Sequence, residues 1–161
     1  MDKGVVQIYF GEGRGKSNAA VGAGLFAAGH GRQVIVIEFL KGKSSAGTAF
    51  IDRLEPEIRF FRFAKSDASF AELSDTARQE EIMNLRNGFH YGRKVASTGG
   101  CDLLILDEIL GAVDENVISV DEMRDLFENR SEDVTIICTG RVLHDGLRQY
   151  ADEIYNIAPE K

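Results

Sequence analysis

The stretch YFGEGRGKS, residues 9–17, places three glycines, a lysine and a hydroxyl residue directly after an apolar run. Glycines let a turn present several backbone N–H groups to one anion, and a following helix adds the positive end of its dipole. Lys16 supplies a point charge, and Ser17 supplies a hydroxyl of the kind that binds Mg²⁺. The spacing therefore predicts a phosphate-binding loop over residues 11–18.

The loop departs from two common glycine patterns. The usual phosphate loop reads G-x-x-x-x-G-K-[ST], whereas only three residues separate Gly11 from Gly15, and Phe10 stands where the outer glycine would be. The dinucleotide pattern G-x-G-x-x-G fails as well, because Lys16 takes the place of its last glycine. The alternative interpretation is a glycine-rich turn that only joins a strand to a helix.

A second chemical feature is the sequence LLILDE, in which Asp107 ends an apolar run and Glu108 follows it. In phosphate-loop ATPases an acid here holds Mg²⁺, directly or through water, opposite the loop hydroxyl. A glutamate beside it can be a second metal ligand or can orient a nucleophile. Ser17, Asp107 and Glu108 are therefore candidate metal ligands. The alternative is that the two acids cap a helix or turn after the strand.

Both features must be positioned by the elements around them. Apolar runs that alternate with amphipathic ones predict an α/β fold in three layers, with a mostly parallel sheet and helices on both faces. The glycine loop between a strand and a helix indicates the phosphate-loop, RecA-like version of that fold. Ligands bind beyond the carboxyl ends of such strands, so residues 10–17, 40–44, 107–111 and 139–142 should share one edge. The expected strands are 5–10, 33–40, 58–63, 101–108, 133–140 and 153–158, and the expected helices are 16–28, 74–97, 119–130 (with Ser119 and Glu122 at capping-box spacing) and 143–151.

The composition limits the class of protein. A chain of 161 residues predicts one domain over residues 1–161, and a net charge of -7 argues against nucleic acid or an anionic membrane as a partner. No apolar run approaches the ~18 residues of a membrane span, and the first residues lack the order of a secretory signal. Cys101 and Cys138 are isolated beside or inside apolar runs, which indicates reduced, buried thiols in a cytoplasmic protein.

The remaining polar candidates are less informative. His30 is expected to cap a helix end, and His90 and His144 are expected to be structural, because the spacing of the histidines forms no metal triad. The sequence KGKSS, residues 41–45, lacks upstream glycines and reads as a basic loop that could close over a ligand.

A shortened loop of the form G-x-G-[KR]-G-K-[ST] resembles that of the phosphate-loop type of ATP:corrinoid adenosyltransferases. The segments GHG, FLKG, LDE and TGR follow it in the order of that family. The resemblance implies that the cobalt(I) of a reduced corrinoid attacks C5′ of ATP and that tripolyphosphate leaves. Preorganised N–H groups, a lysine and Mg²⁺ would neutralise that leaving group. A homodimer and an electron-donating flavoprotein partner are implied as well.

The resemblance also assigns roles to residues. Lys16 would neutralise the triphosphate, Ser17 and Glu108 would hold Mg²⁺ with Asp107 in or near that shell, and Arg141 would lie at the same edge on phosphate or, alternatively, at the surface. The triphosphate would be cradled by Gly11, Glu12, Gly13, Arg14, Gly15, Lys16, Ser17 and Asn18.

Several positions differ from the family pattern. The chain has no tryptophan, and the segment expected to carry corrinoid-contacting aromatics reads FAKSDASFAELSD, residues 63–75, with Phe70 as the replacement or as a core or surface residue. Asn18 replaces a threonine, and Glu38 stands where a glutamine is usual. Two other functions stay open: an ATP hydrolase in which Glu108 orients water, and a degenerate module that binds nucleotide or corrinoid without turnover.

Overall fold

A single parallel sheet forms the centre of the molecule. The computed structural model describes residues 2–40 and 51–161, so the prediction for residues 41–45 lies outside the described residues. Six strands are arranged in the order β3-β2-β4-β5-β1-β6, and every pair of neighbours is parallel. The six predicted strands are confirmed. They are β1 (Val6–Phe10), β2 (Val34–Glu38), β3 (Ile58–Arg62), β4 (Leu103–Asp107), β5 (Thr135–Gly140) and β6 (Glu153–Asn156).

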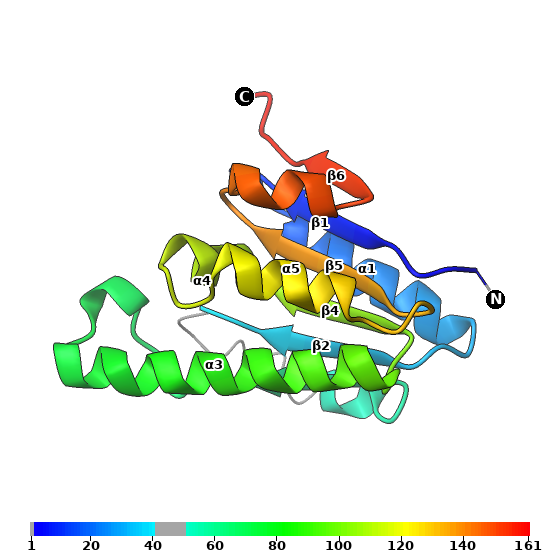
Figure 1. The fold of residues 1–161 in the computed structure, drawn as a ribbon, viewed down its shortest axis with the longest axis horizontal. Helices are drawn as coiled ribbons and strands as arrows, with labels where there is room; N and C mark the ends of the chain where they lie inside the picture. The colour runs from blue at the N-terminus through cyan, green and yellow to red at the C-terminus, as the bar shows by residue number, and fades with distance from the viewer. Residues whose placement is uncertain (1, 41–50) are drawn as a thin grey trace.

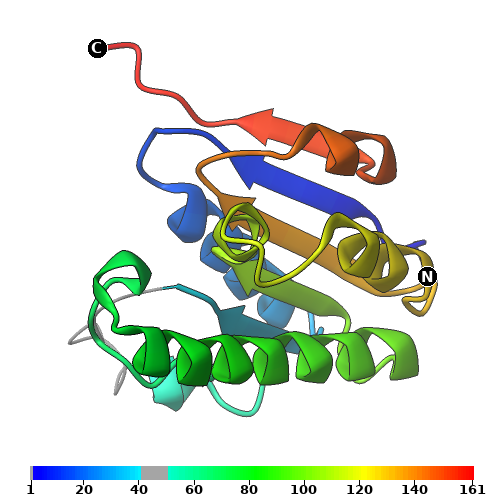
Figure 2. The ribbon, with the colours of Figure 1, turned by 60° about the vertical axis from the view of Figure 1, so that its left-hand side comes forward.

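Helices cover both faces of the sheet, as predicted. Figure 1 shows α3 and α5 in front of the strands and α1 behind them, and the turned view in Figure 2 separates the layers. The helices are α1 (Lys16–Gly29), α3 (Asp75–Thr98), α4 (Ile109–Asp114) and α5 (Val120–Glu128), with short 3₁₀ turns η1 (Asp52–Leu54), η2 (Phe70–Glu72) and η3 (Asp145–Tyr150).

Alternation along the strands divides the core in two. In β2, Val34 and Val36 belong to the smaller cluster on the α1 face, while Ile35 and Ile37 belong to the larger cluster on the α3 and α5 face. Strands buried on both faces are apolar throughout because each side chain meets a helix layer or another strand. The strand ends therefore hold the polar chemistry, as the sequence predicted.

Small residues bring α1 close to the sheet. A Cβ on Gly24 would lie 3.2 Å from Ile105 Cδ1 and 3.3 Å from Val34 Cγ1, and Ala20 is fully buried. Larger side chains would push the helix outward. The small residues of α1 therefore set the distance between the helix and the sheet, and with it the position of the first turn of α1 relative to the strand ends.

The long helix α3 packs against the core with Leu85 and Phe89 buried. Its Arg86 reaches Glu122 of α5 with two hydrogen bonds of 3.3 and 2.6 Å, and Glu122 also completes the predicted capping box with Ser119. In the part of the chain that the structure describes, no helix combines the length and the apolar character needed to cross a membrane.

Two elements differ from the prediction. The predicted helix 143–151 is the 3₁₀ turn η3, because the His144 side chain accepts a hydrogen bond from Gly146 N (3.0 Å) and closes a tight turn. Residues 109–114 form a short helix, α4, that the sequence did not predict. A Cβ on Gly111, within this helix, would lie 2.9 Å from Leu40 Cδ1. Packing against Leu40 therefore explains the glycine.

Candidate functional site

The site begins at the first turn of α1. Gly15 precedes the helix with φ 99° and ψ 0°, a left-handed conformation that favours glycine. Among the described residues, no side chain caps this helix end, and no acid stands in its first turn. The first amides of a helix have no intrahelical acceptor, so this end presents N–H groups and the positive dipole end to an anion.

The glycine loop in front of α1 is fastened to the ends of two other strands. Gly11 N lies 3.2 Å from Gly140 O and 3.1 Å from Arg141 O, and Gly13 N donates to Ile157 O across 2.8 Å. A Cβ on either glycine would lie within 2.6 Å of that Ile157 oxygen. The amides of Gly11 and Gly13 therefore hold the loop in place, whereas the amides at the start of α1 have no intrahelical acceptor.

Lys16 bends back over the same loop. Its Nζ donates to Gly13 O across 2.7 Å, and only 8% of the residue is exposed. The ammonium group is thus held close to the uncapped helix end, where it adds a full charge to the dipole.

Ser17 and Asp107 meet at the centre of the sheet edge. Ser17 Oγ donates to Asp107 Oδ1 across 2.7 Å, and Thr139 Oγ1 donates to the same oxygen across 2.7 Å. Asp107 is 2% exposed and Thr139 is fully buried. Of the two acids in LDE, Asp107 is the one that the structure brings to the loop hydroxyl.

Glu108 points along a different direction from the same strand end. Its backbone is left-handed (φ 63°), and its N–H donates to Thr139 Oγ1 across 2.9 Å. Its Oε2 lies 3.9 Å from the point where a Cβ on Gly111 would be, so the carboxylate lies beside α4. It also acts on Arg141, because the pKa of that guanidinium is raised first by Glu12 and, more weakly, by Glu108.

Arg141 and Glu12 close the outer side of the loop. Two hydrogen bonds of 3.1 Å join the guanidinium to both carboxylate oxygens, although both side chains are more than 60% exposed (68% and 63%). This hydrogen bond to Arg141, followed by its charge, lowers the pKa of Glu12. Arg141 is therefore at the predicted sheet edge, in the fork geometry in which arginine also binds phosphate.

The acid at position 38 lies in the same row. Glu38 is paired in register with Asp107 on one side and with Arg62 on the other. Residues in register on neighbouring strands share a face and lie about 4.8 Å apart. Glu38 therefore lies between Asp107, which contacts Ser17, and Arg62. The positive charge of Arg62 is one strand away from Glu38.

The segment expected to carry aromatic contacts is tied to α3. Phe70 starts η2, packs against the larger core and lies beneath Arg78, whose Cζ is 5.0 Å from the ring centre. Glu81, which is 8% exposed, accepts hydrogen bonds from Lys65 N (2.8 Å) and Ser66 N (3.3 Å). These contacts support a packing role for Phe70, and Glu81 is a buried anchor that no sequence pattern pointed to.

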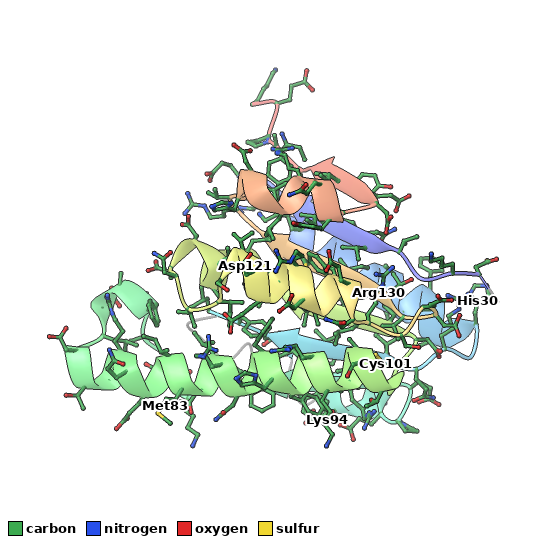
Figure 3. The ribbon with its side chains drawn as sticks, viewed as in Figure 1. His30, Met83, Lys94, Cys101, Asp121 and Arg130 are labelled. Atoms are coloured by element: carbon green, nitrogen blue, oxygen red, sulfur yellow. The ribbon has the colours of Figure 1, made fainter. Side chains whose placement is uncertain are left out.

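Of the other candidates, His30 and His144 cap helical elements, which agrees with the structural roles predicted for them. His30 is the C-cap residue of α1, with its Nδ1 2.7 Å from Phe26 O, and His144 begins η3. Both cysteines are buried and free. Burial raises the pKa of Cys101, just before β4 (Figure 3), to about 12, and it also raises the pKa of Cys138.

The oxygen donors of the site fit Mg²⁺. Ser17 and Asp107 offer a hydroxyl and a carboxylate, the hard ligands that this ion prefers. Within residues 2–40 and 51–161, no group of three or more His, Cys, Asp and Glu could hold a metal by itself. A bound polyphosphate and water would thus complete the shell, which is how Mg²⁺ usually binds beside nucleotides.

Thr139 is a residue of the candidate site that the sequence patterns did not single out. It contacts both acids, and its neighbours Gly140 and Arg141 contact the glycine loop. The available signal was a polar TGR triplet at the end of an apolar strand, next to the strand that ends in LDE.

The three-layer parallel fold, the glycine loop before an uncapped helix and the hydroxyl–carboxylate pair define a protein of the phosphate-loop nucleotide-binding class. The chain belongs to the ATP:corrinoid adenosyltransferase BtuR/CobO/CobP family, whose sequence model matches residues 2–161. This result confirms the resemblance and makes the chain a member of a transferase family.

Individual proteins agree with this assignment. The corrinoid adenosyltransferase of Escherichia coli strain K12 is 27% identical over 99% of this chain and 79% of its own length. The corrinoid adenosyltransferase CobA of Salmonella typhimurium strain LT2 is 26% identical over 99% and 79%. Among solved structures, a KaiC-like protein of Pyrococcus horikoshii OT3 superposes with a TM-score of 0.58 at 15% identity, covering 100% of this chain and 76% of that one, which is a likeness of fold.

Proposed function

We propose that this protein transfers the 5′-deoxyadenosyl group of ATP to the cobalt(I) of a corrinoid and releases tripolyphosphate. The observation that carries the proposal is the convergence of the uncapped α1 end, Lys16 and the Ser17–Asp107 pair at one strand edge. Family membership supplies the corrinoid half of the proposal.

The reaction asks little acid–base work of the protein. Cobalt(I) donates an electron pair to C5′ of ATP, the C5′–O bond breaks, and its electrons leave with the tripolyphosphate. The cobalt is thereby oxidised to cobalt(III) as the Co–C bond forms. The protein must align the two substrates and neutralise a polyanion, and fixed charges and N–H groups do both.

Each part of the site has a role in this scheme. The amides of the first turn of α1 and Lys16 bind the phosphates, and Ser17 and Asp107 hold the metal ion. Mg²⁺, when bound, neutralises charge on the departing phosphates. Arg141 exchanges Glu12 for a phosphate oxygen, and Glu108, whose carboxylate lies beside α4, is the second candidate ligand of the metal ion.

The proposal extends to partners and location. A homodimer and an electron-donating flavoprotein follow from the family resemblance, and the buried free thiols of Cys101 and Cys138 support a reducing, cytoplasmic setting. Sedimentation of the purified protein would test the dimer directly.

The central experiment mixes the protein, ATP, Mg²⁺ and a chemically reduced corrinoid without oxygen. A light-sensitive adenosylcorrinoid and an equal amount of tripolyphosphate are expected. ADP and phosphate would instead indicate a hydrolase, and nucleotide binding without either product would indicate a non-catalytic module. Lys16→Ala serves as the inactive control.

A further inference from the structure

The single hydroxyl group of Thr139 forms hydrogen bonds with two residues of the candidate site, Asp107 and Glu108. Its Oγ1 donates to Asp107 Oδ1 across 2.7 Å and accepts from Glu108 N across 2.9 Å. Thr139 lies in β5, next to β4, and is fully buried. Because the side chain is shielded from water, a lost partner here would not be replaced by solvent.

The direction of the Thr139 hydrogen bond has a consequence for Asp107. A hydroxyl has one hydrogen, and the Glu108 amide can only donate, so the Thr139 hydrogen points at the Asp107 oxygen. Ser17 Oγ donates to that same oxygen across 2.7 Å. Two hydroxyl donors thus fix the plane of the carboxylate and, through it, the direction of the Ser17 oxygen.

Thr139 also supports the backbone that follows Asp107. Glu108 has φ 63°, a left-handed conformation that is unusual for a residue with a side chain. The hydrogen bond to Thr139 satisfies its amide in that conformation. The two acids therefore leave the end of β4 in fixed and different directions, Asp107 toward α1 and Glu108 toward α4.

We propose that Thr139 is a positioning residue that sets the geometry of the Mg²⁺ site by orienting Asp107 and Glu108 together. This inference rests on the Mg²⁺–nucleotide site of the proposed function. Outer partners that orient a metal ligand typically change metal affinity by about 10- to 100-fold when they are removed.

The test compares Thr139→Val, which removes the hydroxyl at similar shape, with Thr139→Ser, which keeps it. Tripolyphosphate binding is measured by calorimetry over a series of Mg²⁺ concentrations and in a chelator. Thr139→Val should need about tenfold more Mg²⁺ for half-maximal binding, with metal-free binding unchanged within about twofold, whereas Thr139→Ser should stay close to wild type.

Thr135→Val provides a matched control at the other end of β5. Its hydroxyl accepts a hydrogen bond from Val5 N across 3.2 Å, so the variant also loses one polar contact of the strand. It should lower the melting temperature slightly and leave the Mg²⁺ dependence unchanged. If Thr139→Val behaves like Thr135→Val, Thr139 is only structural and the inference is wrong.

The outcomes also separate this inference from the proposed function. If the wild-type protein binds Mg²⁺–tripolyphosphate but makes no adenosylcorrinoid, the transfer proposal fails, while the shifted Mg²⁺ dependence of Thr139→Val would still support the role of Thr139. A wild-type protein that binds neither ATP nor tripolyphosphate would overturn both proposals.

Discussion

Ser17 and Asp107 are 90 positions apart in the chain, yet the hydroxyl of one lies 2.7 Å from the carboxylate of the other. The contact joins the start of α1 to the end of β4, at the place where we propose that Mg²⁺ binds. Its two members offer the atoms that a magnesium–polyphosphate complex needs.

Asp107→Asn should therefore raise the Mg²⁺ concentration needed for half-maximal ATP binding about tenfold or more, because the ionised ligand is lost. Binding in a chelator should be kept, since a negative charge near the phosphates is also removed. Titration of a fluorescent ATP analogue with Mg²⁺ measures both. Asp102→Asn, just before the opposite end of β4, changes a carboxylate that accepts from Gln33 N (2.8 Å) and should leave the titration unchanged.

Lys16→Ala should weaken ATP and tripolyphosphate binding by roughly 10- to 100-fold, because it removes the buried ammonium group that binds the phosphates in the proposed function, a contact worth one charged hydrogen bond or more. Calorimetry with each ligand measures the loss. Lys94→Ala removes an exposed lysine of α3, labelled in Figure 3, and should bind both ligands normally. Equal affinities for the two variants would contradict a phosphate site at the loop.

The Arg86–Glu122 pair predicts a change in acid stability. The hydrogen bond from Arg86 is the largest cause that lowers the pKa of Glu122 to about 2, below its ordinary value of 4.5. A lowered pKa means that the pair stabilises the fold fully above pH 4.5 and that this stability is lost as the pH falls toward 2. Glu122→Gln keeps the capping-box geometry but removes the charge.

The free energy of unfolding of Glu122→Gln should fall by roughly 1 kcal/mol at pH 7, a value discounted for partial exposure, and should decline less steeply between pH 4.5 and 2. Urea unfolding at several pH values measures this. Asp121→Asn changes the neighbouring acid, which is 81% exposed, and should keep the wild-type profile. Parallel profiles for all three proteins would show that Arg86 does not stabilise the Glu122 anion.

Two glycine-to-alanine substitutions should have opposite effects on stability. A Cβ on Gly22, within α1, would meet no atom of its surroundings within 4 Å among residues 2–40 and 51–161, so Gly22→Ala should raise the free energy of unfolding by roughly 0.5–1 kcal/mol. A Cβ on Gly140 would lie 2.4 Å from Leu110 Cβ, so Gly140→Ala should lower it by roughly 1–3 kcal/mol. Chemical denaturation of both variants tests the close contact between β5 and α4.

Much of the fold could be predicted from local patterns. Residues 103–107 are apolar and end in an acid, and Ser119 and Glu122 form a capping box, so each carries its signal within a few positions. The helix α4 could not be predicted in this way. A larger residue than Gly111 would clash with Leu40, and the two residues approach each other only in the folded chain.

The candidate site was predictable in its residue types but not in its pairings. Lys16, Ser17 and Asp107 follow from the motifs, whereas the choice of Asp107 over Glu108 as the partner of Ser17 depends on which way each leaves β4. The contacts of Thr139 depend on β5 lying next to β4. No single segment of the sequence determines the strand order β3-β2-β4-β5-β1-β6.

The glycine loop rests on both strands that flank β1, since Gly13 is held by Ile157 beyond β6 and Gly11 by the backbone that follows β5. Its two anchoring points lie on opposite sides of β1, so the separation of β5 and β6 sets the distance that the loop must span. A substitution that moves the outer strand sideways would therefore reshape the phosphate cradle without altering any residue in it.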